Sequence, residues 1–496
     1  MKLLTSLLWL LPLSVLANGQ IIIGKDQAPI NKHDYAILKE VAKNAELSID
    51  SFRHYKSRRN NHYIVGPEGM LYWDIKRNGI IDGDDEPETG LIARLGNSYI
   101  TDKDGYVLAL AIRESHFSDT SILNKFKKLV AIDLSDNQVT EVNIFGLPNL
   151  RHLRVFETKH HKTITRLSNV NTLAYFKVYK LIEPNFSKLS GVKGLHRIEV
   201  VGMSIESFAG LENMPNLKIL DVSLSGEVNN ENARALKGIP KWHQLERLKF
   251  TSHTLTNIDQ LSNFSGLKRA ELWLTNDKIK GLSSIGKLKN LEELEITSPS
   301  VTDFSFLKSV PKLKKIVTVH SPITSLAGLN NAPNLEHLEL NIGKLTQISH
   351  LEQNIKLKTL ILNNHKIEKL SGLSNLKKLK TLDVSVNKIS KFEGLDSNIC
   401  LEEIGMASNP VKKLDNVYHL PLLYLLDVDD TKIREFPRWK ELKRLHKLRV
   451  KETQLDPDTF TDRDFWWVNV PIEDFDLQLR TSPKITDEER RKYGCI

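Results

Sequence analysis

The residues with the clearest potential for ligand chemistry form an acidic run, DIKRNGIIDGDD, within the first hundred positions. A calcium-binding loop needs oxygen-bearing side chains at fixed positions around a central glycine. Asp74, Asn78 and Asp82 fit such positions. Lys76, however, places a cation where an oxygen ligand is needed, and Asp85 stands where a bidentate glutamate is expected. We therefore predict a solvated acidic turn, with calcium binding as the alternative.

Signals for catalysis are weak in this sequence. Residues 18–100 contain scattered histidines and aspartates but no Gly-x-Ser-x-Gly, His-Glu-x-x-His or phosphate-binding glycine loop. Three imidazoles can coordinate zinc, and His152, His160 and His161 could supply them. The segment KHHKT around His160 and His161 is, however, typical of a basic loop. We therefore expect no metal, no cofactor and no enzymatic activity.

Aromatic and basic side chains alternate in four short stretches in the middle of the chain. Such residues concentrate binding energy in protein interfaces, where one anchor contributes about 2 kcal/mol or more. We predict that a partner docks on them; the alternative is that the aromatic rings fill an inner curve or lie beneath a loop. The candidate partner-binding residues are His152, Arg154, Phe156, Tyr175, Lys177, Tyr179, Arg247, Lys249, Arg269 and Trp273.

The elements that would position these side chains belong to an internal repeat. The phrase Leu-x-x-Leu-x-Leu-x-x-Asn-x-Leu and its relaxed forms recur every 22 residues in the second half of the chain. A fixed period in this range is typical of a stacked solenoid, in which neighbouring turns bury one another's apolar residues. These copies begin at Leu313, Leu335, Leu357, Leu379, Leu401, Leu423 and Leu445.

Looser copies precede them and bring the prediction to about sixteen turns. They begin at Val107, Leu129, Leu150, Leu173, Leu195, Leu217, Leu245, Leu267 and Leu291. Residues two apart on a strand share a face, so the frame leucines should point inward and the candidate binding residues outward. Two longer intervals, 217–245 and 267–291, predict surface loops or, around residues 230–238, a longer convex helix.

The second half of each turn repeats Ile-x-x-Leu-x-Gly-Leu, as in IEKLSGL at 367–373 and ITSLAGL at 323–329. With the 22-residue phrase, this resembles the bacterial internalin-type leucine-rich repeat over roughly residues 107–455. The resemblance implies an α/β solenoid: a curved stack with a parallel concave sheet and short convex 3₁₀ or helical segments. It also implies that the concave face binds another protein at a cell surface. No LPxTG-like sorting motif is found, so we expect a freely secreted or periplasmic protein.

The amino-terminal segments predict a leader and a cap. Residues 1–17, MKLLTSLLWLLPLSVLA, resemble a secretory signal peptide cleaved after Ala17. Residues 18–105 lack the repeat and predict a small α+β capping module. In it, Asn31 would cap a helix, and the runs YIVG, MLYWDI and SYIT would form short strands.

The solenoid is expected to span residues 106–456, followed by a cap and tail at 457–496. The run TFTDRDFWWVNV places several bulky apolar residues directly after the last repeat. Their expected role is to cover the exposed edge of the final turn. These residues are Phe460, Phe465, Trp466, Trp467 and Val470.

The chain has two cysteines, for which we expect no disulfide. Cys400 precedes the frame residue Leu401 and predicts a packed interior thiol, whereas Cys495 lies several turns further along the chain. The scarcity of cysteine favours stabilisation by stacking rather than by disulfides.

The formal charge of +9 is spread along the chain as lysine pairs that alternate with glutamate. This pattern is typical of a solvated surface; attraction to an acidic surface or glycan is the alternative. No later apolar stretch reaches the roughly 18 residues of a membrane span. The leading prediction is an exported, monomeric, non-enzymatic protein that recognises a macromolecular partner, a protein first and not a nucleic acid. The alternatives are a secreted enzyme or toxin with a catalytic amino-terminal module, and a scaffold resembling phosphatase regulators.

Overall fold

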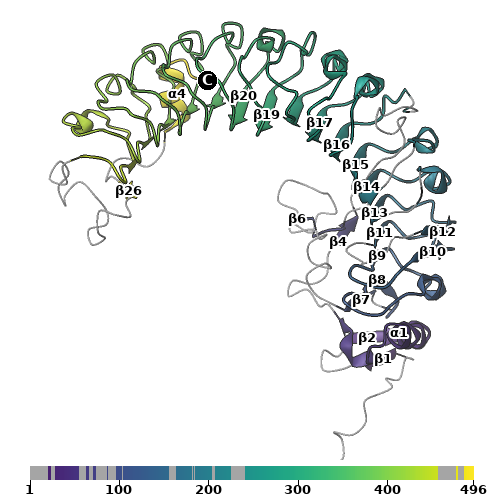
Figure 1. The fold of residues 1–496 in the computed structure, drawn as a ribbon. Helices are drawn as coiled ribbons and strands as arrows, with labels where there is room; N and C mark the ends of the chain where they lie inside the picture. Colours follow the sequence, from purple (N-terminus) through teal and green to yellow (C-terminus); the bar gives the residue numbers. More distant parts are fainter. Residues whose placement is uncertain are drawn as a thin grey trace, which may run out of the picture. The chain divides into compact units, whose positions relative to one another are not determined.

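A computed structural model describes most of the chain as strands, tight turns and short helices (Figure 1). These residues form two compact units, unit 1 (Met1–Thr254) and unit 2 (Leu255–Ile496). The described residues are 20–23, 28–54, 63–65, 71–73, 86–87, 97–102, 104–155, 163–180, 183, 185–203, 207–224, 239, 241–455, 476–478 and 485–496.

Unit 1 begins with small α and β elements, in agreement with the predicted strands and helix. β1 pairs with β2, and β4, β5 and β6 form a second antiparallel sheet. The bounds are β1 (Gln20–Ile23), β2 (Ala28–Asn31), α1 (Lys32–Asn44), the 3₁₀ turn η1 (Ile49–Ser51), β3 (Arg53–His54), β4 (Tyr63–Val65), β5 (Leu71–Trp73), β6 (Glu86–Pro87) and β7 (Ser98–Thr101).

Helix α1 begins as predicted, with Asn31 as its N-cap residue. The side-chain oxygen of Asn31 accepts a hydrogen bond from the backbone N–H of Asp34 at 2.9 Å, which satisfies one of the free donors at the helix start. Ile37 and Leu38 are buried with the rest of the apolar face. Asp34 is also buried, and its carboxylate accepts a bond from the backbone N–H of Val107 at 2.7 Å. The helix is thereby tied to the first repeat strand.

The rest of unit 1 is a stack of turns whose strands pair in parallel, as the repeat predicts. β7 joins this sheet by antiparallel pairing with β8. The strands are β8 (Val107–Ala111), β9 (Ala131–Asp133), β11 (His152–Val155), β13 (Tyr175–Tyr179), β14 (Arg197–Met203), β15 (Ile219–Leu224) and β16 (Arg247–Ser252). The connecting segments contain η2 (Thr120–Lys125), η3 (Ser187–Leu189), η4 (Leu211–Asn213) and a two-stranded parallel sheet of β10 (Glu141–Phe145) and β12 (Thr163–Ser168).

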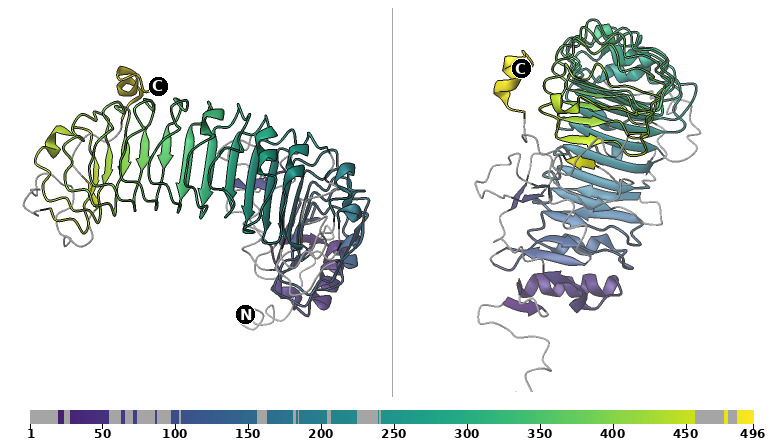
Figure 2. Two further views of the ribbon diagram at one scale, coloured as in Figure 1. Left: turned by 45° about the horizontal axis from the view of Figure 1, so that its top comes forward. Right: turned by 90° about the vertical axis from the view of Figure 1, so that its left-hand side faces the viewer.

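Unit 2 continues the same design with a parallel sheet and 3₁₀ connections (Figure 2). Its strands are β17 (Arg269–Leu274), β18 (Glu293–Thr297), β19 (Lys315–Val319), β20 (His337–Asn341), β21 (Thr359–Ile361), β22 (Thr381–Asp383), β23 (Glu403–Gly405), β24 (Leu425–Asp427), β25 (Lys447–Arg449) and the antiparallel β26 (Asp476–Gln478). Its helical segments are η5 (Asp259–Asn263), η6 (Leu282–Lys287), η7 (Leu329–Asn331), η8 (Trp439–Glu441) and α4 (Asp487–Lys492).

The interior of each turn is filled by frame residues that pair at 22-residue spacing. Leu338, Leu360 and Leu382 occupy equivalent positions of adjacent strands and are fully buried. The polar residue at the ninth position of the phrase links neighbouring turns, because its side-chain amide bonds backbone groups of the turn before it. Asn387 Nδ2 donates to the carbonyl of Leu362 at 2.8 Å, and its Oδ1 accepts from the backbone N–H of Ile367 at 3.0 Å.

The residue before this polar position has a positive φ in each turn from β19 to β25. This left-handed conformation suits glycine and asparagine and is unfavourable for β-branched side chains. The residues are His320, Ile342, Asn364, Val386, Ser408, Asp430 and Glu452. Ile342 and Val386 are therefore unusual, and both are exposed (39% and 46%).

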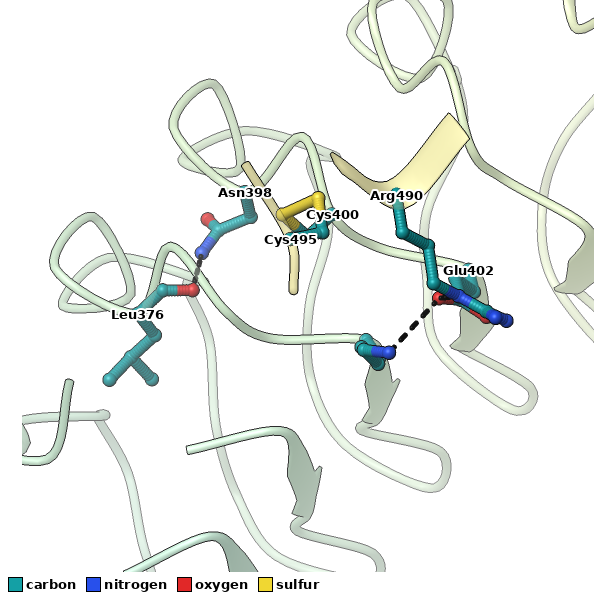
Figure 3. Close-up of a disulfide and its surroundings, with 7 residues drawn as sticks. Leu376, Asn398, Cys400, Glu402, Arg490 and Cys495 are labelled. Carbon is teal, nitrogen blue, oxygen red and sulfur yellow. Dashed lines mark hydrogen bonds and ion pairs between the residues drawn. A yellow bond between two sulfur atoms is a disulfide. The ribbon is translucent and has the colours of Figure 1, made fainter. Parts of the chain in front are cut away.

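The expectation of two unpaired cysteines is wrong. Cys400 and Cys495 form a disulfide, with Cα atoms 5.5 Å apart (Figure 3). The tail doubles back, because β26 runs antiparallel to β25 and α4 lies beside earlier turns of unit 2 (Figures 1 and 2). Arg490 of α4 bonds both carboxylate oxygens of Glu402 at 2.8 and 2.9 Å. Separation along the repeat was therefore a poor guide to distance in space.

Several predicted features lie outside the described residues. They are the leader at 1–17, the acidic run at 74–85, the histidine pair at 160–161, the insertion at 225–238 and the aromatic run at 460–470. The predictions made for them stay predictions.

Candidate functional site

The candidate site is the sheet face, which we define as the outward-pointing strand positions of the two parallel sheets. Because pairing is in register, these positions form columns in which one residue of each turn stands beside its equivalent 22 residues away. In unit 1 the central column includes Asp133, Arg154, Lys177, Glu199 and Asp221. The structure therefore brings Arg154 and Lys177 side by side, as the sequence predicted.

The central column of unit 1 is a ladder of charged side chains, in which two cations are flanked by acidic residues. Arg154 Nη1 lies 3.8 Å from Asp133, and Lys177 Nζ lies 2.7 Å from Glu199, which also pairs with Arg197. Burial alone would raise the pKa of Glu199, but the two cations outweigh it and leave the pKa lowered. These charges are largely neutralised within the protein.

The first column of unit 1 contains the two aromatic candidates that the structure buries. His152 and Tyr175 are 9% and 4% exposed, and their ring centroids are 4.5 Å apart. Burial lowers the pKa of His152 to about 4, so the ring is neutral at pH 7. Burial and the charge of Glu199 raise the pKa of Tyr175. Both rings are packed within the protein rather than open to a partner.

The other candidates of unit 1 are more accessible. Tyr179 is partly exposed at the end of β13, with the Lys180 ammonium 5.5 Å from its ring centroid. Arg247 and Lys249 are partly exposed on β16. Phe156 lies outside the described residues.

Arg269 and Trp273 belong to unit 2. Arg269 pairs with Glu271 at 2.8 Å and with Glu293 at 3.1 Å. Trp273 is 41% exposed, and its indole N–H donates to Glu295 at 3.2 Å. Trp273 is thus an open aromatic side chain, as predicted for an interface anchor.

Sequence reasoning missed the pattern of the central column in unit 2. From β18 to β24 this column alternates strictly between an acidic and an uncharged residue. The acidic residues are 44 positions apart in the sequence, which is twice the repeat length. This spacing can be recognised as a column only when the outward-pointing positions of successive strands are aligned. The column reads Glu295, Val317, Glu339, Ile361, Asp383, Gly405 and Asp427.

Neutral donors hold most of these carboxylates in place. Glu339 accepts from the Asn341 amide at 2.7 Å, and Asp383 accepts from the Ser385 hydroxyl at 2.6 Å. Gly405 leaves room for its neighbour, because a Cβ there would meet Asp383 Oδ1 at 2.5 Å. Such contacts orient the acids without cancelling their charge.

The described part of the chain has neither a metal-binding cluster nor a membrane-spanning helix. No cluster of three or more His, Cys, Asp or Glu side chains there could hold a metal ion. Within the same residues, no helix combines the length and apolar character needed to cross a membrane.

Comparison with known proteins places the repeat in a class. Residues 355–397 match the family model described as Leucine Rich repeats (2 copies). With the 22-residue register of the strands, this match identifies the fold of the described turns as a leucine-rich-repeat solenoid. The predicted fold, a stack of turns with a parallel sheet and short 3₁₀ segments, is confirmed.

Solved structures similar to the chain include two from Listeria monocytogenes and one from Leptospira interrogans. The Listeria internalin InlF is 17% identical, with a TM-score of 0.45 over 72% of this chain and 92% of its own. A Leptospira leucine-rich-repeat protein is 18% identical, with a TM-score of 0.48 over 68% of this chain and 82% of its own. The functional domain of Listeria InlJ is 18% identical, with a TM-score of 0.46 over 74% of this chain and 75% of its own. No curated protein sequence matched the chain.

Proposed function

We propose that this chain is an exported, non-enzymatic recognition protein that binds another protein through its sheet face. The observation that carries the proposal is the accessibility and order of that face in unit 2. Its central residues are partly exposed, and regular backbone pairing fixes them in line. A preordered surface loses little conformational freedom on binding, which favours affinity.

The two units contribute differently to this proposal. Accessible candidates such as Tyr179, Arg269 and Trp273 would contact the partner directly, as interface anchors do. The buried pair His152 and Tyr175 would instead hold its neighbours in position, together with the ladder of charged side chains in unit 1.

Export is proposed from two features. The leader-like residues 1–17 have the charge and apolar run of a signal peptide. The Cys400–Cys495 disulfide is typical of proteins that mature in an oxidising compartment.

A matched pair of substitutions tests the binding face. Ile361 lies on the face, whereas Ile355, which is 57% exposed, lies outside the strands of unit 2. A partner captured with the mature chain would be titrated against Ile361→Arg and Ile355→Arg. We expect Ile361→Arg to weaken binding by about tenfold or more, since a charge at an interface centre blocks close packing. Equal affinity for both variants and the wild type would contradict the proposal.

A further inference from the structure

The central column of unit 2 is acidic on a chain whose net charge is +9. Four carboxylates, those of Glu295, Glu339, Asp383 and Asp427, stand in one line, each 44 residues after the last. Glu295, Glu339 and Asp383 accept hydrogen bonds from uncharged side chains, namely an indole, an amide and a hydroxyl. Asp427 differs, because Arg449 Nη1 lies 3.1 Å from it. Glu339 Oε2 also lies 3.2 Å from His337 Nε2, a ring that carries charge only when it is protonated. We therefore take Glu295, Glu339 and Asp383 as the acidic positions of this face.

The spacing of these acids is set by the sheet. Adjacent strands lie about 4.8 Å apart, so carboxylates on every second strand repeat at about 9.6 Å. Three residues of a polyproline II helix make one turn and span about 9.3 Å, so every third side chain of such a segment lies on the same face. A peptide in this conformation that lies across the strands would therefore bring every third side chain over a carboxylate.

Apolar side chains follow the same two-turn period. The positions between the acids are Val317, Ile361 and Gly405, which offer uncharged surface between the charges. The exposed Ile342 and Val386 lie three residues after Glu339 and Asp383 on the same turns. The face therefore presents charge and apolar surface in alternation, rather than a simple acidic patch.

From this complementarity we propose that the sheet face of unit 2 binds a segment of a partner protein in the polyproline II conformation, with lysine or arginine at every third position. The residues between these cations are small or apolar. This inference rests on the proposed function and names the chemistry of its partner. The ligand runs along the stack, and its cations pair with Glu295, Glu339 and Asp383.

The test uses the full mature chain and two synthetic peptides of equal composition. One repeats Lys-Gly-Ala four times, and the other has its four lysines in one block. Isothermal titration in low salt is expected to show tighter binding of the spaced peptide. That preference should shrink as salt is added, because partly exposed charges are screened. Equal binding of the two peptides, or none of either, would overturn the inference.

A triple variant and a matched control separate this face from general attraction. Glu295→Gln with Glu339→Gln and Asp383→Asn removes three charges from the column. Three exposed pairs, each contributing a few-fold, make a loss of about tenfold the expected result. Glu368→Gln with Glu393→Gln and Asp396→Asn removes the same charge outside the strands of unit 2 and should leave binding of the spaced peptide unchanged. Equal losses in both variants would mean non-specific attraction and would overturn the inference.

Failure of the inference can be distinguished from failure of the proposed function. If Ile361→Arg weakens binding of a captured protein but the spaced peptide neither binds nor competes, the face recognises a partner of different chemistry. In that case the proposed function stands and the inference falls. If neither the captured protein nor the peptide responds to substitutions on the face, both fall.

Discussion

Individual side chains on the sheet of unit 1 show how burial changes charge. His152 is nearly inaccessible, and its pKa falls from 6.5 to about 4 because burial disfavours the charged ring. In the unfolded chain the ring regains an ordinary pKa and binds a proton at a higher pH. The folded state therefore loses stability as the pH drops from about 6.5 towards 4.

We expect this histidine to make unit 1 acid-sensitive. Between pH 7 and pH 5 it should cost the folded state about 2 kcal/mol, and His152→Gln should remove that part of the pH dependence. Denaturant unfolding at the two pH values measures the difference. The partly exposed His419, replaced by glutamine in the same way, is the control. An unchanged pH slope in His152→Gln would show that burial of this ring does not act through its protonation.

In each turn from β19 to β25, the residue before the ninth position of the repeat has a left-handed backbone conformation, with a positive φ. Val386 has a φ of +59°, where a β-branched side chain is strained, whereas Asn364 holds the equivalent place one turn earlier at +58°. Val386→Asn should therefore stabilise the chain by about 1 kcal/mol. The reverse change, Asn364→Val, should cost a similar amount. Urea midpoints measure both, and a destabilised Val386→Asn would contradict the argument.

Among the elements, α4 is the one whose place depends on contacts far apart in the sequence. The disulfide joins residues 95 positions apart, and Cys400, Leu422 and Cys495 form a small buried cluster. Arg490 pairs with Glu402, and Arg444 with Glu489, on the same side. These contacts attach the tail to the stack and cover part of the turns it lies beside.

Removing the bridge should loosen this element first. Closing a loop of this length contributes about 2–5 kcal/mol, mainly by restricting the unfolded chain. Cys495→Ala is expected to lower the unfolding midpoint and speed hydrogen exchange in α4. Arg490→Ala keeps the bridge and should cost less, since partly exposed ion pairs contribute about 1 kcal/mol or below. Alkylation of two free thiols in the native, non-reduced protein would show that the bridge does not form.

At the scale of the whole molecule, the in-register stacking of the repeats places equivalent side chains of successive turns in long columns. A residue type that recurs every 22 or 44 positions becomes a line on the sheet face, and a line is the shape an extended ligand can match. This is why the surface pattern matters more here than any single residue. The proposed export would decide which partners this face can meet.

Export gives a whole-molecule prediction. Cells producing the full chain should release a mature form that begins at Asn18, outside the cytoplasm, with the Cys400–Cys495 bridge formed. Cell fractionation and mass spectrometry of the amino-terminal peptide measure this. A cytoplasmic chain that keeps residues 1–17 and has reduced cysteines would argue against export.

The local design of the fold could be predicted from the sequence because it is encoded by short-range patterns. The 22-residue period of leucines predicted the stacked parallel strands, and Asn31 predicted the start of α1. Asn387 acts over the same short range, because its bonds reach backbone groups at fixed offsets within the repeat. Each of these features depends on residues in the same turn or in the next one.

Tertiary structure alone decided the features that depend on distance in space. The return of the tail set Cys495 against Cys400, although the repeat frame places them turns apart. Packing buried Tyr175 and His152, which alternation had placed on an open face. Strand register aligned Glu295 with Val317 and Val317 with Glu339. Acidic residues 44 positions apart in the sequence therefore stand in one column of the sheet. Sequence periodicity fixes which side of a strand a residue occupies, but only the folded chain determines what covers it and what stands beside it.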